Sequence, residues 1–184
     1  MFFAAPGMEN TADTVKLAVS RARERGIRQI VAASYRGTTA RELVPYAQEF
    51  QIVIVGQVYG FRAGEPNPMT AEVRQELQSA GMQLLFGTHA LSGAERGLSS
   101  KFQGIYPVEI IAHTLRMLGQ GTKVCVEIST MALDSGLINE GEDVVSIAGT
   151  GKGADTALVI RPAHAQRILE TRIQEMICKP RLVE

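Results

Sequence analysis

A hydroxyl-rich turn after an apolar run is the first place in the chain where chemistry can be expected. The apolar run is 30–33, and the turn that follows it consists of Ser34, Tyr35, Arg36, Gly37, Thr38 and Thr39. A turn of this kind at the start of a helix offers hydroxyls, a guanidinium, a glycine that lets the backbone approach an anion, and the positive end of the helix dipole. These residues are therefore candidates to bind a phosphate. A simple helix cap at Thr38 or Thr39 explains the same sequence equally well.

A second glycine-rich loop follows another apolar run. It consists of Gly149, Thr150, Gly151, Lys152, Gly153, Ala154, Asp155 and Thr156. It is not a P-loop, because the lysine does not follow the glycines at the required spacing and no long helix comes after it. A simple turn between two strands nevertheless requires neither three alternating glycines nor a lysine and an aspartate. We expect this loop to contact a ligand.

Four side chains could transfer protons if the protein is an enzyme: His89, Glu127, Asp134 and Lys152. His89 follows a predicted strand and is of the residue type that titrates near neutral pH, although a loop histidine bonded to the backbone is the alternative. Glu127 and Asp134 are seven residues apart and would share one helix face. Pairs of carboxylates are also common on solvated helices that have no catalytic role. No Ser-His-Asp grouping or metal-ligand cluster is evident, so the reaction stays unassigned and no metal is expected.

Aromatic residues near the predicted strand ends could stack on a flat ring. They are Tyr35, Tyr59 and Phe61, the last two in a long loop, 57–68, that contains two prolines. Side chains that merely cover a loop core would show the same pattern.

The hydrophobic pattern places these candidates on a regular framework. Short β-branched runs predict buried strands at 29–33, 52–55, 82–86, 143–148 and 157–160. Helices are predicted at 11–25, 39–48, 70–80, 107–118 and 123–135, with Pro45 kinking or shortening the second of them, and a last helix is expected between His164 and Pro180. No element is predicted within 87–106. This alternation predicts a three-layer α/β sandwich with a mostly parallel sheet, in which ligands bind at the carboxyl ends of the strands.

Composition limits the possible partners. The 184 residues suit one domain spanning 1–184, and 19 basic residues balance 19 acidic ones, so no overall charge favours a nucleic acid polymer or a membrane surface. Cys125 and Cys178 lack metal-ligand spacing and are too few for a disulfide framework, which suits a reducing cytoplasm. No run approaches the roughly 18 to 20 apolar residues of a membrane helix. We therefore expect a soluble, cytoplasmic protein.

Two stretches resemble the C-terminal α/β domain of pyruvate kinase. Residues 30–46 (IVAASYRGTTARELVPY) resemble a strand, an STSGTT-type loop and a helix of that enzyme. Residues 137–156 (LINEGEDVVSIAGTGKGADT) resemble its ending, in which a glycine and an acidic residue precede a strand with two valines and a glycine loop. The similarity to the stand-alone family of pyruvate kinase C-terminal-domain-like proteins covers nearly the whole chain. It includes the segments 6–11, 59–61, 88–93, 106–107, 115–116, 120–124 and 149–157.

The resemblance implies a five-stranded sheet of order 3-2-1-4-5 with the last strand antiparallel. The loops at Ser34 and Gly149 would then face each other across the point where the strand order reverses. It further implies that Ser34, Gly37, Thr38 and Thr39 are phosphate ligands, since the corresponding loop of pyruvate kinase holds a phosphate of its sugar bisphosphate effector. Tyr35 and Arg36 stand where the family usually has small hydroxyl residues.

Further candidate ligand residues in the resembling segments are Asn10, Thr11 and Thr88. His89 would lie about 10 Å from the reversal point, two strands away at ~4.8 Å each, and would reach a ligand there only if its loop folds back. The catalytic residues of pyruvate kinase belong to its barrel domain, which nothing in this sequence resembles. The chain is therefore not expected to act as a pyruvate kinase by itself.

The sequence thus predicts a protein that binds a phosphorylated small molecule between the two loops. Flavin mononucleotide, another nucleotide and a sugar phosphate all remain open as the ligand. The alternative is a non-catalytic regulatory or assembly module, compatible with a homo-oligomer, that responds to a phosphorylated effector. A structural protein with no ligand at this point is a third reading.

Overall fold

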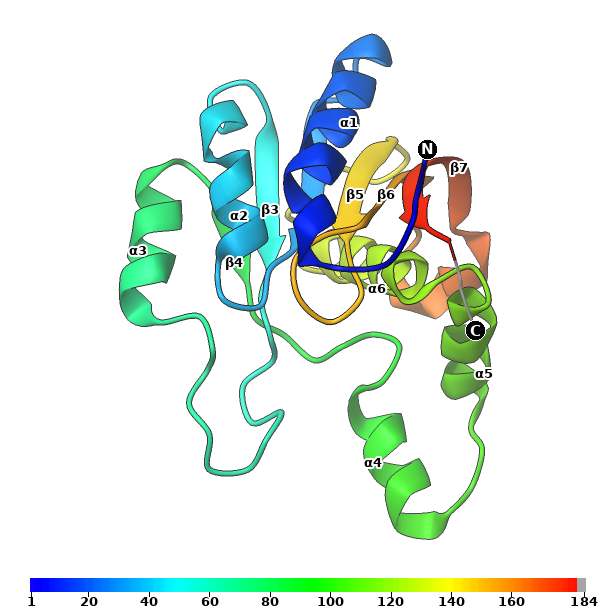
Figure 1. The fold of residues 1–184 in the computed structure, drawn as a ribbon. Coiled ribbons are helices and arrows are strands. Elements are labelled where there is room, and N and C mark those ends of the chain that lie inside the picture. Colours follow the sequence, from blue (N-terminus) through cyan, green and yellow to red (C-terminus); the bar gives the residue numbers. More distant parts are fainter. Residues whose placement is uncertain (182–184) are drawn as a thin grey trace.

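The computed structural model describes residues 1–181, which form a seven-stranded sheet covered by helices on both faces (Figure 1). The strands lie in the order β1-β7-β6-β5-β2-β3-β4. Their bounds are β1 Phe2–Phe3, β2 Gln29–Ala33, β3 Gln51–Val55, β4 Gln83–Leu85, β5 Val144–Ala148, β6 Thr156–Arg161 and β7 Arg172–Pro180.

Strands β2 to β6 are the five that the sequence predicts, and their order β4-β3-β2-β5-β6 confirms the expected 3-2-1-4-5 arrangement. β2 pairs in parallel with both β3 and β5, β3 pairs in parallel with β4, and β6 is antiparallel to β5. The chain runs outward from β2 to β4 and then returns to the other side of β2 at β5. The strand order therefore reverses between β2 and β5.

The predicted helix in the C-terminal tail is wrong. A short 3-10 helix, η3, covers Ala165–Glu170, and Arg172–Pro180 is the strand β7, antiparallel to β6. β7 in turn pairs in parallel with the two-residue strand β1, which the sequence did not predict. The sheet thus has two more strands than expected on its β6 side.

The helices form two layers. Their bounds are α1 Thr11–Glu24, α2 Thr38–Leu43, α3 Ala71–Ser79, α4 Gly93–Phe102, α5 Pro107–Arg116 and α6 Gln120–Asp134, with further 3-10 turns η1 at Met8–Asn10 and η2 at Val44–Tyr46. Alternate strand residues face the two layers: Ile30 and Ala32 pack in one core with α1, α2 and α3, whereas Val31 packs in another with α5 and α6. This pattern is the reason why uncharged β-branched runs formed the strands.

Most helix predictions are confirmed. Pro45 does shorten the second helix, because α2 ends at Leu43 and Pro45 lies in η2. α6 is a helix, as predicted for 123–135, and α4 was not predicted because its polar, glycine-containing sequence buries no residue. In residues 1–181 no helix is both long enough and apolar enough to cross a membrane.

Candidate functional site

A cleft of about 530 Å³ lies at the edge of the sheet where β2, β3, β4 and β5 end. Most of its lining residues end or follow these strands or lie in α6, and they include Ser34, Gln57, His89, Lys123 and Gly149. Arg116 comes from the end of α5. Phe61 and Arg62 come from the segment between β3 and α3, and Ser92 and Arg96 from the start of α4. In Figure 1 both of these regions extend from the side of the sheet toward which β3 points. We call this the switch-point cleft.

The first predicted loop reaches the cleft only in part. Ser34 and Tyr35 line it, whereas Arg36, Gly37, Thr38 and Thr39 do not. The Ser34 hydroxyl accepts a hydrogen bond of 3.3 Å from the Ala40 amide in the first turn of α2, so it satisfies one of the free amides at the start of that helix. The Arg36 guanidinium lies over the Tyr35 ring, 5.7 Å from its centre.

Gly37 is required by its surroundings. Its φ of +96° favours glycine, and a Cβ at this position would lie 2.5 Å from a methyl carbon of Val73 in α3. Thr39 is buried beside it. The turn therefore joins β2 to α2 and packs against α3. Its second half helps to hold these elements together and does not line the cleft.

The second predicted loop is folded around a buried carboxylate. The Asp155 side chain accepts hydrogen bonds from the amides of Gly7 and Thr150, at 3.3 and 3.1 Å, and from the Thr156 hydroxyl at 2.7 Å. Thr11 accepts a hydrogen bond from the Ala154 amide at 3.0 Å. Asp155 and Thr11 thus fix the shape of the loop and do not themselves line the cleft.

This folding leaves several backbone amides of the loop without an acceptor. Gly149, Gly151, Lys152 and Gly153 line the cleft, and the amide groups of the three glycines have no acceptor among the residues that the structure describes. A Cβ on Gly153 would lie 2.6 Å from the Met8 Cα, so the close approach of the N-terminal segment requires glycine there. Amide groups held in this way are suited to bind an anion.

The charges around the cleft are strongly asymmetric. Its lining contains the cationic residues Arg62, Arg96, Arg116, Lys123 and Lys152. Within residues 1–181, Glu127 is the one acidic residue of the lining, and it is paired with Lys123. Of the remaining four cations, Arg62 also pairs with Glu65 at 3.6 Å, whereas the other three have no acidic partner within residues 1–181. The lining is therefore positively charged and attracts an anion, although the whole chain has no net charge.

Lys123 and Glu127 form a buried ion pair at one wall of the cleft. Their Nζ and Oε2 atoms are 2.5 Å apart, and each side chain is 5% exposed. The other carboxylate oxygen of Glu127 accepts a hydrogen bond of 2.9 Å from the Leu91 amide, which ties α6 to the segment after β4. Burial lowers the pKa of the Lys123 ammonium below its ordinary value, an effect that Glu127 opposes.

The segment after β4 does fold back toward the point of strand reversal. It brings His89 into the lining of the cleft, with its ring centre 6.0 Å from that of Phe61. Burial lowers the pKa of His89, Glu127 raises it, and the nearby cations Lys123 and Arg96 lower it further. The imidazole is therefore neutral near pH 7.

The other candidates are distributed as follows. Phe61 lines the cleft, but Tyr59 does not. The Tyr59 ring packs edge-on against Phe86, with 5.7 Å between the ring centres. Asn10 donates to the Ala5 carbonyl at 2.9 Å. Neither Asn10 nor Thr88 is part of the lining.

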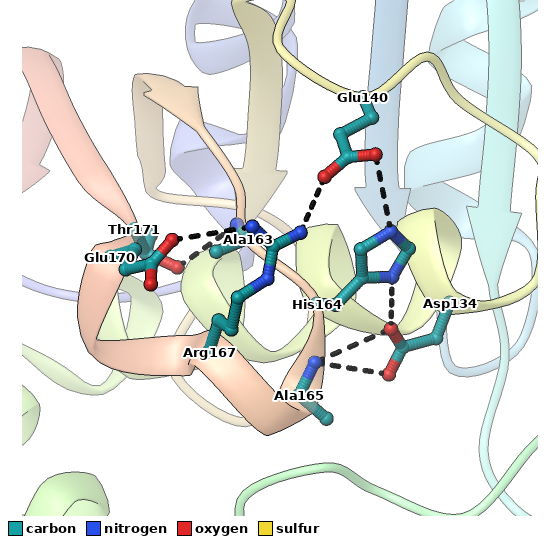
Figure 2. Close-up of polar contacts among 8 residues, drawn as sticks. All are labelled: Asp134, Glu140, Ala163, His164, Ala165, Arg167, Glu170 and Thr171. Carbon is teal, nitrogen blue, oxygen red and sulfur yellow. Dashed lines mark hydrogen bonds and ion pairs between the residues drawn. The ribbon is translucent and has the colours of Figure 1, made fainter.

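Asp134 lies at the far end of α6, away from the cleft (Figure 2). Its carboxylate contacts His164 Nδ1 at 2.7 Å and accepts from the Ala165 amide at the start of η3. Glu140 adds an ion pair of 2.5 Å with Arg167. This cluster anchors η3 to α6, and the structure does not bring Asp134 together with Glu127.

Several cleft residues were not candidates in the sequence analysis. They are Gln57, Arg62, Arg96, Arg116 and Lys123. The Gln57 Nε2 atom is buried without a partner in residues 1–181, and it marks a place where a ligand acceptor would fit. The four-residue spacing of Lys123 and Glu127 was the available signal, but that spacing is also common on solvated helices.

Two solved structures and one protein family are similar to this chain. The chain is similar in structure to a pyruvate kinase from Cryptosporidium parvum, with a TM-score of 0.45 and 17% identity over 83% of this chain and 23% of that one. A structure of Cryptosporidium parvum pyruvate kinase in complex with ADP matches with a TM-score of 0.42 and 18% identity, over 81% of this chain and 22% of that one. The chain thus spans less than a quarter of these enzymes. The family described as "Pyruvate kinase, alpha/beta domain" matches residues 12–160, and the chain belongs to this family.

Proposed function

We propose that the switch-point cleft binds a phosphorylated small molecule: flavin mononucleotide, another nucleotide or a sugar phosphate. The observation that carries this proposal is the charge of the lining: besides the Lys123–Glu127 and Arg62–Glu65 pairs it contains Arg96, Arg116 and Lys152, together with glycines whose amides have no acceptor in residues 1–181. Phosphate oxygens are the ligands that such groups bind best. The phosphate would lie against Gly149, Gly151 and Lys152.

The remainder of the ligand would extend toward the aromatic side chains of the lining. Phe61 and His89 present rings there, and Gln57 offers its unpaired Nε2 donor. A flat base or isoalloxazine ring would stack on the aromatic side, whereas a sugar would use the polar groups. Binding at the point of strand reversal is the general rule for open parallel sheets.

A thermal-shift assay with matched ligand pairs tests the proposal. Flavin mononucleotide, AMP and fructose 1,6-bisphosphate should be compared with riboflavin, adenosine and fructose. At 100 times its Kd a ligand adds about 2.7 kcal/mol to the free energy of unfolding. In a chain of this size that raises Tm by roughly 5 to 10 °C. We expect at least one phosphorylated compound to do so and its dephosphorylated partner to have a much smaller effect.

Lys152→Ala should weaken that ligand by about ten- to a hundredfold, because it removes a charge-assisted contact to phosphate. Lys16→Ala is the matched control, since Lys16 is an exposed lysine on α1 that does not line the cleft. Equal shifts with riboflavin and flavin mononucleotide, and with each of the other pairs, would contradict a phosphate site.

A second candidate function, a regulatory or assembly module, is favoured by the surface beside the cleft. Large apolar side chains are exposed on α4, on α5 and next to them, namely Leu98, Phe102, Ile105, Ile110, Met117 and Leu118. α4 also supplies Arg96 and α5 supplies Arg116 to the cleft. A ligand could therefore alter contacts between two copies of the chain through these helices.

A further inference from the structure

We propose that Lys123 forms an imine with a phosphorylated aldehyde or ketone bound in the switch-point cleft. This inference rests on the proposed function, because the phosphate must hold the carbonyl group within reach of the amine. It adds a carbonyl group to the phosphate as a feature of the ligand, and it identifies the Lys123 amine as the reactive group of the cleft.

The position of Lys123 is the first argument. It is the one lysine of α6, it lies one turn inside the helix, and its side chain lines the cleft although it is only 5% exposed. Lys152 lies on the Gly149 loop and lines the same cleft. A compound whose phosphate contacts Lys152 and the glycine amides therefore shares the cavity with the Lys123 amine.

The fold alone does not explain Lys123. Glu127 already fastens the segment after β4 through its 2.9 Å hydrogen bond with the Leu91 amide, and this contact needs no lysine. A buried ion pair is often no more stabilising than apolar side chains of similar volume. A buried amine at the wall of a cleft is instead typical of imine-forming lysines, because burial lowers the pKa of the ammonium group.

Burial of the amine favours its deprotonation, whereas the charged groups that face it act in both directions. Burial lowers its pKa, and so do the nearby guanidinium groups of Arg96 and Arg116, whereas Glu127 opposes them. Glu127 is also the group placed to accept the proton, at 2.5 Å. His89, neutral near pH 7, is a second group in the lining that can carry a proton.

The step balances without a further reactant. The Lys123 ammonium passes a proton to Glu127, the free amine attacks the carbonyl carbon, and the carbinolamine oxygen leaves as water after it receives that proton and one from nitrogen. The carbon–oxygen double bond is replaced by a carbon–nitrogen double bond. Overall, an ammonium and a carbonyl give an iminium and water, with no oxidation or reduction.

Reductive trapping tests the proposal. The full chain is incubated with dihydroxyacetone phosphate or glyceraldehyde 3-phosphate, treated with sodium borohydride, digested and mapped by mass spectrometry. We expect a secondary-amine adduct on the peptide that contains Lys123. Dihydroxyacetone without the phosphate should label that site about tenfold less, which corresponds to ~1.4 kcal/mol of phosphate binding, and inorganic phosphate should compete.

Exposed lysines in the same digest, Lys16 and Lys101, report unspecific labelling. Lys123→Arg keeps a positive charge opposite Glu127 and should abolish the adduct, whereas Lys152→Arg should reduce labelling of Lys123 only through weaker binding. Equal labelling of Lys16, Lys101 and Lys123 would overturn the proposal.

Parallel thermal shifts separate this proposal from the proposed function. If dihydroxyacetone phosphate or glyceraldehyde 3-phosphate raises Tm but gives no adduct on Lys123, the cleft binds phosphate and the imine is wrong. If neither compound raises Tm nor labels Lys123 while flavin mononucleotide raises Tm, the proposed function stands and the imine is again wrong. If no phosphorylated compound raises Tm, the proposed phosphate site is wrong. Labelling of Lys123 would then show a reactive amine without phosphate recognition, and the imine proposal, which requires a bound phosphate, would be overturned as well.

Discussion

At the scale of single residues, Glu127 and Asp134 show that two carboxylates on one helix can differ in burial and in their partners. Glu127 lies in the middle of α6 and is buried, whereas Asp134 lies in the last turn and is exposed. The seven-residue spacing predicted that they share a face, but it could not predict which part of that face the sheet covers. The sequence therefore identified Glu127 as a candidate and missed its partner.

The stability of the Lys123–Glu127 pair can be measured by a double-mutant cycle. Glu127→Gln keeps an acceptor for the Leu91 amide but leaves the Lys123 ammonium without a counter-charge, so we expect the free energy of unfolding to fall by about 3 to 5 kcal/mol. Adding Lys123→Met should recover most of that loss, because the buried charge is then gone. Urea unfolding at pH 7 measures both effects.

An exposed ion pair provides the control for this cycle. Arg23 pairs with Glu49 at 2.6 Å on the surface, and Arg23→Ala should leave the urea midpoint nearly unchanged. If the double variant Lys123→Met, Glu127→Gln is as unstable as Glu127→Gln alone, then the loss does not arise from an unpaired buried charge.

At the scale of elements, β7 shows where the hydrophobic period misleads. Its apolar residues Ile173, Met176 and Ile177 are spaced as on a helix, and the tail was predicted to be one. In the structure, register shifts between β6 and β7 interrupt the two-residue alternation of the strand. By contrast, β2, β3 and β5 are buried on both faces and unbroken, which is why their uncharged runs predicted them correctly.

The packing of α6 on β6 gives a prediction at the same scale. A Cβ on Gly121, in the first turn of α6, would overlap the side chain of Thr156 in β6. Gly121→Ala should therefore push the start of α6 off the sheet and lower the free energy of unfolding by about 1 to 3 kcal/mol.

Gly97 in α4 is the matched control, because a Cβ there meets nothing within 4 Å. Gly97→Ala should be neutral or add up to about 1 kcal/mol through higher helix propensity. Urea unfolding of the two variants under the same conditions makes the comparison. Similar losses in both would show that helix propensity, and not the contact with Thr156, decides the effect.

At the scale of the whole molecule, the cleft connects a rigid edge of the sheet with a loosely held helix. Ser34 and Gly149 follow strands that are buried, whereas α4, which supplies Arg96, has no buried residue. The composition of the two loops, together with the strand order that the family resemblance implied, predicted that Ser34 and Gly149 lie at the same edge of the sheet, and both line the cleft. They could not predict which cations line it, because Arg62 and Arg96 lie in segments without a hydrophobic pattern.

This arrangement predicts that a bound anion strengthens self-association. A phosphate that contacts Arg96 would hold α4 in place. The entropic cost of ordering α4 is then lower when the apolar surface around Phe102 and Met117 contacts a second copy of the chain. Sedimentation velocity at fixed protein concentration, with and without the ligand that raises Tm, should show a larger dimer fraction with ligand. Phe102→Glu should abolish the dimer and leave the thermal shift intact, since Phe102 does not line the cleft. A chain that stays monomeric at every ligand concentration would exclude the assembly function and leave binding in the cleft as the property to explain.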